Sequence, residues 1–236
     1  MKKVFIGIMA LLIIGMPMSA LPAQQLRTHE AVVMTQELQD RMSPKEILDR
    51  FKAGNLRFVR GKSTQRNYFA ERSLTSASQH PYAIVLSCID SRMPVEIIFD
   101  KSIGDTFNAR IAGNIVNVDI LGSMEYATKV SGAKLILIMG HTNCGAIKSA
   151  IADVRLGNIT ALLQHIKPAI SSTKDFENRT DKNKEFVSAV TKQNVILAEK
   201  QILEGSPIIK QLVADGKVKI VGCVYNLETG LVDFYE

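Results

Sequence analysis

The sequence predicts an α/β fold with a mainly parallel β-sheet core, flanked by α-helices and closed by a C-terminal strand hairpin. The runs 82–87 (YAIVLS) and 134–139 (KLILIM) are apolar, rich in branched residues and of strand length. Helical stretches lie between and after these runs, which favours parallel strands covered on both faces. Two more apolar runs, 218–225 and 231–235, flank a polar turn and predict the hairpin.

The helices follow from start signals and apolar spacing. Ser43, Pro44 and Glu46 predict a helix start, with Ser43 as the N-cap, Pro44 in the first position and Glu46 closing a capping box. Apolar residues continue this helix at roughly helical spacing to Phe58. The other expected elements are a third strand within 104–116 and helices at 120–130, 146–155, 159–171 and 186–203.

Cys88, His141 and Cys144 form a set of three strong zinc ligands. Cys88 and His141 each lie just past the carboxyl end of a predicted strand, where open α/β sheets bind their ligands. Cys144 follows His141 by three residues at an expected helix start, so one turn places both on the same face, and the helix N-terminus lowers the thiol pKa. Three protein ligands leave a fourth position open, which is typical of catalytic zinc.

Asp90 and Arg92 extend the first cluster. If the chain stays extended after Cys88, residues 88, 90 and 92 point the same way. Asp90 then reaches the open metal position, and Arg92 holds its carboxylate through two hydrogen bonds. This pair predicts a switch: the site is closed with Asp90 on zinc and open with Asp90 on Arg92. An ordinary ion pair is the alternative interpretation.

The pattern Cys-x-Asp-x-Arg, followed about fifty residues later by His-x-x-Cys, resembles the β-class carbonic anhydrases. Further similarities are the segments 104–107 (GDTF), 110–114 (RIAGN), 140–146 (GHTNCGA) and 222–226 (GCVYN). The resemblance runs from roughly residue 43 to residue 234. It implies reversible hydration of CO2 to bicarbonate and a proton by zinc-bound hydroxide, with one Zn²⁺ per subunit. The family's zinc ligands correspond to Cys88, His141 and Cys144, and its Asp–Arg pair to Asp90 and Arg92.

The resemblance also implies a subunit partner. Family members are dimers or larger with the active site at the subunit interface, so a homodimer or homotetramer is expected. Some members place a Gln nine residues before the first Cys, where it hydrogen-bonds zinc-bound hydroxide or bicarbonate from the neighbouring subunit; Gln79 has this spacing. Gly113 is a candidate substrate-binding backbone amide. The alternatives are that Gln79 caps a turn before Pro81 and that Gly113 only shapes a turn.

The first residues have the features of a secretory signal peptide. Lys2 and Lys3 precede the uncharged apolar stretch 4–16, and small residues follow up to Ala23. The expected organisation is a signal peptide at 1–23, an N-terminal arm at 24–42 and a zinc-dependent domain at 43–236. This predicts a periplasmic or secreted protein without a stable membrane anchor after cleavage. A retained anchor is the rival interpretation, although the apolar stretch is short for a membrane span.

Composition narrows the function classes further. Loss of Lys2 and Lys3 with the signal peptide would lower the net charge from +6 to +4, and no aromatic-basic stripe occurs, so nucleic-acid binding is not expected. Three cysteines are too few for a disulfide-built fold, and Cys223 is expected to be a buried core thiol. Two functions remain as alternatives: hydrolysis of another small linear electrophile such as CS2 or COS, and a non-enzymatic zinc-stabilised module.

Overall fold

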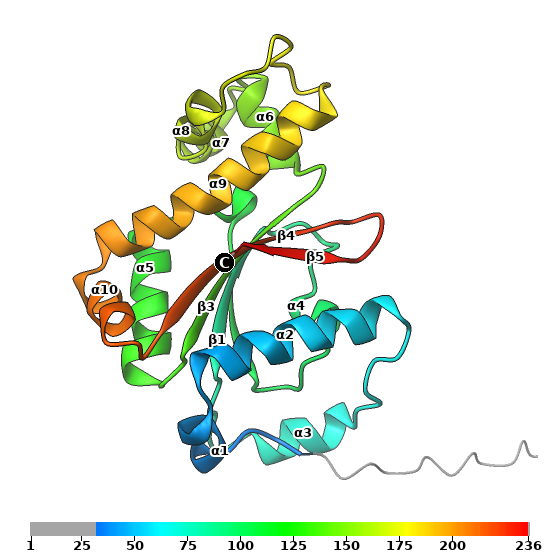
Figure 1. Ribbon diagram of the computed structural model, residues 1–236, viewed down its shortest axis with the longest axis vertical. Helices are drawn as coiled ribbons and strands as arrows, with labels where there is room; N and C mark the ends of the chain where they lie inside the picture. Colours follow the sequence, from blue (N-terminus) through cyan, green and yellow to red (C-terminus); the bar gives the residue numbers. More distant parts are fainter. Residues whose placement is uncertain (1–31, 236) are drawn as a thin grey trace, which may run out of the picture.

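The computed structural model describes residues 32–235, in which five strands form one sheet in the order β2-β1-β3-β4-β5 (Figure 1). β1, β2, β3 and β4 are parallel, and β5 pairs antiparallel with β4. This arrangement confirms the predicted fold class and the C-terminal hairpin. The strands are β1 (Ala83–Ser87), β2 (Thr106–Arg110), β3 (Leu135–His141), β4 (Lys219–Tyr225) and β5 (Val232–Tyr235).

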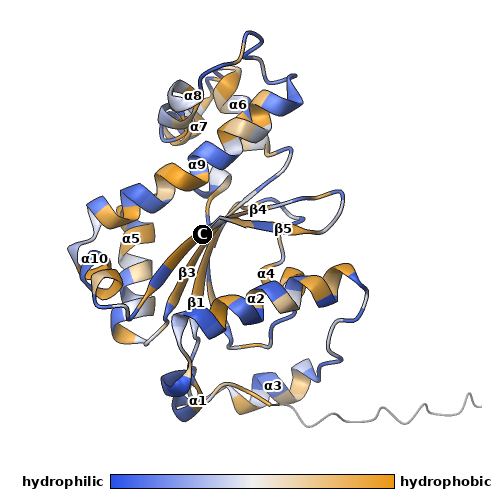
Figure 2. Ribbon diagram, in the orientation of Figure 1, coloured by the Kyte–Doolittle hydropathy of each residue, from blue (hydrophilic) through white to orange (hydrophobic). Residues whose placement is uncertain are grey.

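The central strands are buried on both faces because the pleat sends alternate side chains to opposite sides. Val85 and Leu137 face one apolar core, whereas Ile84 and Ile136 face the other. Figure 2 shows these central strands as the most continuous hydrophobic segments of the molecule. Their unbroken apolar sequence therefore reflects a sheet that is covered on both faces.

The first face of the sheet is covered mainly by α2. Ile47, Leu48 and Phe51 of this helix are fully buried against the strands. The predicted capping box is present, because the Ser43 side chain accepts from Glu46 N–H and the Glu46 carboxylate accepts from Ser43 N–H. The helices on this side are α1 (Gln36–Arg41), α2 (Pro44–Val59), α3 (Tyr68–Leu74) and α4 (Val95–Ile98) (Figure 1).

The second face is covered by helices from the middle and the end of the chain. Val195, Ala198 and Ile202 of the longest helix are buried against β1, β3 and β4 residues. The elements on this side are α5 (Val118–Glu125), its π-helical continuation (Tyr126–Val130), α9 (Lys184–Gly205) and α10 (Pro207–Ala214) (Figure 1).

A third apolar cluster lies beyond the carboxyl ends of the parallel strands. Cys88 and Cys144 belong to it, together with Ile166 and the amino-terminal part of α9 at Phe186. The surrounding elements are the 3₁₀ turn η1 (Ala112–Asn114), α6 (Gly145–Ile151), α7 (Gly157–Gln164) and α8 (Lys167–Ser172). This cluster excludes water from one side of the predicted zinc ligands.

Several helix boundaries differ from the sequence predictions. The helix expected at 159–171 is two helices, because the chain breaks before Pro168, which lacks an N–H and occupies the first turn of α8. The helix expected at 146–155 ends at Ile151, and Asp153 adopts a positive φ of 50°. The sequence did not predict α3, α4 or α10, nor the helix α1 within the segment interpreted as an arm.

The predicted signal peptide at 1–23 and the first part of the predicted arm lie outside the described residues. Within 32–235, no helix is both long and apolar enough to cross a membrane. Helix α1 is attached to the domain, because the buried Gln39 side chain donates to Pro81 O and Ser131 O at 2.7 and 2.8 Å.

Candidate active site

Three elements bring the predicted zinc ligands together. Cys88 follows β1, His141 is the last residue of β3, and Cys144 is the N-cap residue of α6. Their ligand atoms all lie within 4.8 Å of one another, and all three residues are buried. Because β1 and β3 are adjacent and parallel, their carboxyl ends meet at one edge of the sheet. The sequence therefore located this cluster correctly.

The path from His141 to Cys144 differs from the prediction. Residues 142 and 143 form a turn, in which Asn143 has a φ of 55°, and α6 begins only at Gly145. The expected turn of helix between the two ligands is therefore wrong. Asn tolerates this left-handed conformation better than most residues, and the turn folds Cys144 back toward the imidazole.

The imidazole of His141 is oriented for metal binding. Its Nδ1 lies 3.0 Å from Thr142 O, and a carbonyl oxygen can only accept, so Nδ1 carries the proton. Nε2 is buried and has no hydrogen-bond partner within residues 32–235. A buried lone pair without a donor is costly unless a cation occupies it. Nε2 is therefore the metal-binding atom of this side chain.

The β4–β5 hairpin holds the residue that orients His141. Thr142 N–H donates to Tyr225 O at 3.0 Å, and the Thr142 hydroxyl accepts from Leu227 N–H at 3.0 Å. These two bonds fix Thr142, whose carbonyl oxygen accepts the hydrogen bond from the imidazole Nδ1–H. Such partners of a ligand commonly set its tautomer and ring orientation.

The two buried thiols are electrostatically coupled. A hydrogen bond from Cys144 lowers the pKa of Cys88 below its ordinary value, and the N–H of Gly113, 3.4 Å from Cys88 Sγ, contributes in the same direction against the effect of burial. The neighbouring Cys88 raises the pKa of Cys144 above its ordinary value. Ionisation of one thiol therefore disfavours ionisation of the other. A dication removes this repulsion, because its charge compensates two thiolates at once. Two sulfurs and one imidazole nitrogen are a donor set that fits Zn²⁺.

Asp90 and Arg92 form the predicted pair but not by the predicted route. The guanidinium donates to both carboxylate oxygens at 2.9 and 2.7 Å, and Asp90 Oδ2 lies 3.8 Å from His141 Nε2. The chain is not extended here: Met93 N–H bonds to Asp90 O in a turn, and Arg92 N–H donates to Asp90 Oδ1. The turn, rather than strand alternation, brings the two side chains together.

Arg110 supports this loop and was not anticipated from the sequence. Its guanidinium donates to Cys88 O at 3.1 Å and to Asp90 O at 2.6 Å. Arg110 ends β2, which pairs in register with β1, so the side chain lies beside the segment after Ser87. No pattern in the sequence indicated this role, because the strand expected within 104–116 ends at Arg110 only in the structure.

Comparison with known proteins identifies the family. The profile of the carbonic anhydrase family matches residues 83–232, which include all three candidate ligands and both members of the Asp90–Arg92 pair. The chain belongs to the carbonic anhydrase family. Carbonic anhydrase 2 of Mycobacterium tuberculosis is 33% identical over 186 residues, covering 76% of this chain and 86% of that protein. The carbonic anhydrase of Mycolicibacterium smegmatis is 36% identical over 190 residues, covering 77% and 88%.

Solved carbonic anhydrases of the β class share the fold. The β-carbonic anhydrase of Coccomyxa, in complex with acetazolamide, has a TM-score of 0.62 at 25% identity and covers 81% of this chain and 84% of its own. The β-carbonic anhydrase CcaA has a TM-score of 0.63 at 24% identity and covers 81% and 88%. This chain is thus a β-class carbonic anhydrase, a zinc-dependent lyase acting on CO2 and bicarbonate with one zinc per subunit. The alternative of a non-enzymatic zinc module is excluded.

The two candidate substrate-binding residues of this carbonic anhydrase lie in different places. Gln79 is exposed before the amino end of β1, whereas Cys88 follows the carboxyl end of that strand. Gln79 is therefore remote from the zinc ligands of its own subunit. Gly113 is buried beside the site, and its N–H points to Cys88 Sγ. The predicted roles of both residues in substrate binding stay predictions.

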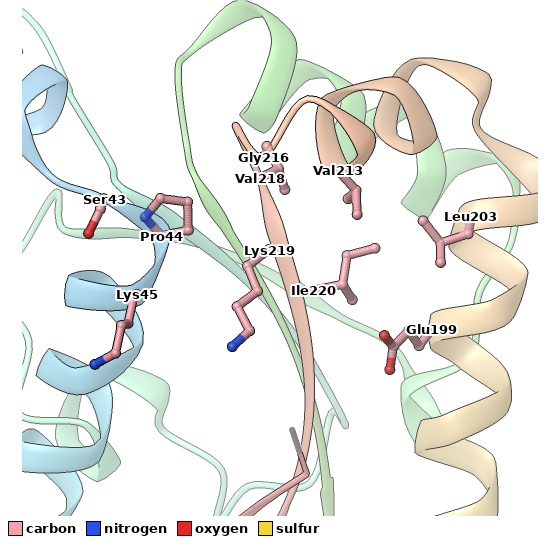
Figure 3. A pocket seen from close by; sticks show the side chains of 10 residues that line it. All are labelled: Ser43, Pro44, Lys45, Glu199, Leu203, Val213, Gly216, Val218, Lys219 and Ile220. Atoms are coloured by element: carbon pink, nitrogen blue, oxygen red, sulfur yellow. The ribbon is translucent and has the colours of Figure 1, made fainter.

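Cavities occur at both ends of the sheet. The pocket in Figure 3 has a volume of about 440 Å³ and lies at the amino end of β4, among residues such as Lys219, Ile220 and Glu199. Since β4 runs from there to Tyr225, which pairs with His141, this pocket is far from the zinc ligands. A cavity of about 760 Å³ instead lies at the metal end and includes Arg92 and Thr142 in its lining.

Proposed function

We propose that this carbonic anhydrase is an exported oligomer in which Asp90 and Arg92 control access to the metal. The observation that carries the gate is the position of Asp90, whose carboxylate bonds to Arg92 on one side and lies 3.8 Å from His141 Nε2 on the other. A small movement of this carboxylate would exchange the guanidinium for the metal. The bond to Arg92 and a position on the metal are therefore alternative states of one side chain.

The reaction joins water and CO2 to give bicarbonate and a proton. When bound, zinc supplies a Lewis acid that lowers the pKa of water, to about 7 with neutral ligands and higher with two thiolates. The hydrogen bond from Arg92 holds the pKa of Asp90 well below its usual range, so this carboxylate is an acceptor only. Asp90 would accept a hydrogen bond from the attacking oxygen and so orient its lone pair toward CO2. Gln79 of a neighbouring subunit is the proposed donor near the substrate, because the Gly113 N–H already donates to Cys88 Sγ.

The first test is stopped-flow CO2 hydration by the zinc-loaded protein lacking residues 1–23, from pH 6.5 to 9. Activity that climbs toward alkaline pH is expected, because the nucleophile is water that has lost a proton, and this form increases with pH. Parallel assays with COS and CS2 measure whether another linear electrophile is preferred. A pH-independent rate, or faster turnover of either sulfur compound, would contradict the proposal.

Exposed apolar side chains support a subunit partner. Phe69, Val118 and Val130 are 75%, 78% and 70% exposed, and β2, at the edge of the sheet, lies beside Val118 and Tyr126 in one pocket lining. Exposed apolar side chains beside an edge strand, as Val118 and Tyr126 are here, are typical of association surfaces. The solved β-carbonic anhydrases of Sordaria macrospora are described as tetrameric; one is 25% identical, with a TM-score of 0.59, covering 67% of this chain and 82% of its own. We therefore propose a homodimer or homotetramer.

Sedimentation of the zinc-loaded protein at micromolar concentration tests the assembly. A dimer or larger species is expected, and a monomer would contradict both the oligomer and the role of Gln79 in trans.

Gln79→Ala should raise KM for CO2 while leaving zinc content unchanged, since a donor from the partner touches substrate rather than metal. Gln65→Ala is a matched control because Gln65 is also an exposed glutamine.

The proposed export rests on residues 1–23. A short positive region followed by an apolar stretch and small residues directs a chain to secretion, and the expected destination is the periplasm or the medium. The full chain expressed in a Gram-negative host should yield a periplasmic protein that begins after Ala20 or Ala23. Replacing Leu11 and Leu12 with Arg should retain the uncleaved protein in the cytoplasm. Recovery of uncleaved wild-type chain in the membrane fraction would favour an anchor.

A further inference from the structure

A buried asparagine on α9 contacts the loop beside the zinc site. Asn194 is 5% exposed, and its Nδ2 donates to Gly113 O at 2.9 Å, across 81 positions of sequence. Its neighbours on the buried face of the helix are the apolar residues Val190, Val195 and Ala198. An amide in an apolar environment is costly unless its hydrogen bonds are made. An asparagine is therefore tolerated at residue 194 because its side-chain amide bonds to Gly113 O.

Gly113 lies between Asn194 and the zinc ligand Cys88 and forms a hydrogen bond with each. Its N–H donates to Cys88 Sγ at 3.4 Å, while its carbonyl accepts from Asn194. The residue has a φ of +70°, and a Cβ at this position would lie 2.8 Å from Ile166 Cδ1 and 3.2 Å from Ala146 Cβ. A side chain is thus excluded by both conformation and space. The carbonyl held by Asn194 belongs to the peptide after Gly113, and the φ of +70° with its close packing relates this peptide to the preceding one, whose N–H is directed at the sulfur.

We propose that Asn194 is a positioning residue of the zinc site, which acts through Gly113 on the Cys88 thiolate. An N–H···S hydrogen bond withdraws negative charge from the sulfur and fixes its direction toward the metal. Loss of a partner of this kind typically lowers metal affinity by about 10- to 100-fold. Asn194 therefore contributes to zinc retention without touching the metal or the substrate.

Two substitutions and one matched control test this assignment. Asn194→Asp preserves the shape but removes the donor, and Asn194→Leu replaces the amide with an apolar side chain of similar size. Thr191→Val is the control, since Thr191 is also buried one turn earlier in α9 and its hydroxyl donates to Val187 O of the same helix. Zinc affinity is measured by competition with a chromophoric chelator, and Co²⁺-substituted proteins report the sulfur-to-metal charge-transfer absorption.

Both Asn194 variants should bind zinc about 10- to 100-fold more weakly than the wild type. Their sulfur-to-cobalt absorption should move to lower energy, because the sulfur becomes more electron-rich, while Thr191→Val should match the wild type in both measurements. A purely structural role predicts lower thermal stability of the Asn194 variants with unchanged zinc affinity and unchanged absorption. That result would overturn the proposal.

A measurement on the wild-type chain keeps the proposal testable if the variants do not fold. In protein loaded with ¹¹³Cd, a hydrogen bond to a metal-bound sulfur transmits scalar coupling between the amide proton and the metal. Coupling at the Gly113 amide is expected, together with protection of the Asn194 side-chain amide from exchange. Absence of the Gly113 coupling in a folded, cadmium-loaded protein would contradict the assignment.

Discussion

At the scale of single residues, Asp90 carries two competing contacts, to Arg92 and toward the metal ligands. The hydrogen bond from Arg92 keeps the pKa of Asp90 low, so the carboxylate stays ionised throughout the neutral and alkaline range. Protonation of Asp90 therefore does not account for a change in activity between pH 6.5 and 9. The carboxylate can move within that range, but it does not change its charge.

Replacing Asp90 should weaken catalysis and remove the gate. Asp90→Asn is expected to lower kcat/KM for CO2 by about 10- to 100-fold at equal zinc content, because the amide cannot replace the ionised acceptor. Arg92→Ala should also lower activity, since it frees Asp90 to occupy the metal. The double variant of Asp90→Asn with Arg92→Ala should show no lower kcat/KM than Asp90→Asn alone, because Arg92 acts through Asp90. Unchanged rates across pH in Asp90→Asn, measured by stopped flow, would remove Asp90 from the mechanism.

Lys101 provides a pH-dependent contribution to stability. Its ammonium group is buried, bonds to Arg50 O at 3.1 Å and lies 4.5 Å from the centre of the Phe51 ring. Burial lowers the pKa of Lys101 to about 8 from 10.5. The folded state therefore disfavours the charged form, and this penalty is complete below about pH 8 and disappears as pH rises toward 10.5.

The effect is measured as the difference in unfolding free energy between the wild type and Lys101→Met. From pH 7 to pH 10.5 this difference should change by about 3 kcal/mol in favour of the wild type, at 1.36 kcal/mol per pH unit. Urea unfolding of both zinc-loaded proteins gives the values. Lys182→Met, at an exposed position, should show no such change. A constant difference for Lys101→Met would contradict the predicted pH window.

At the scale of elements, the start of α2 combines a local signal with a long-range consequence. The capping box of Ser43 and Glu46 fixes where the helix begins, and this sets which side chains face the sheet. Gly54 on the same helix packs closely against Phe99, the C-cap residue of α4, since a Cβ there would lie 1.9 Å from Phe99 O. The helix therefore needs both its start and its small residue to cover the sheet.

Ser43→Ala should lower the free energy of unfolding by about 1 kcal/mol, the usual cost of losing a helix N-cap. Urea unfolding measures the loss. Ser43→Asp should retain most of the stability, because aspartate also caps helices. Equal stability of Ser43→Ala and wild type would show that packing of the buried face alone determines the start of α2.

At the scale of the whole molecule, zinc connects segments that are distant in sequence. Its ligands come from the ends of β1 and β3 and from the start of α6. The metal therefore links the central sheet to the apolar cluster under α6 and α8. An ion that binds the folded chain and not the unfolded chain stabilises it by mass action.

Removal of zinc with a chelator should lower the Tm by roughly 10 °C, the shift expected for about 4 kcal/mol in a domain of this size. Calorimetry before and after chelation measures the change, and zinc should restore the original transition whereas magnesium should not. A Tm that is indifferent to chelation, with the metal shown to be absent, would contradict a stabilising role of zinc.

The sequence by itself determined the features that depend on neighbouring residues and on side-chain chemistry. Branched apolar runs predicted β1, β3 and β4, the box at Ser43 predicted the start of α2, and two thiols with an imidazole at strand ends predicted zinc. These signals are local because strand burial, helix capping and ligand identity are properties of short segments.

Only the tertiary structure decided how the site is held. The turn at Asp90, the bonds of Thr142 to the hairpin, Arg110 beside the Cys88 loop and the contact from Asn194 to Gly113 had no pattern of their own in the sequence. The physical reason is that, apart from the local turn at Asp90, each contact joins polar groups far apart in sequence, whose distance is set by strand pairing or by helix packing across the sheet. An asparagine on α9 becomes part of the zinc site only once α9 lies over the ends of the strands.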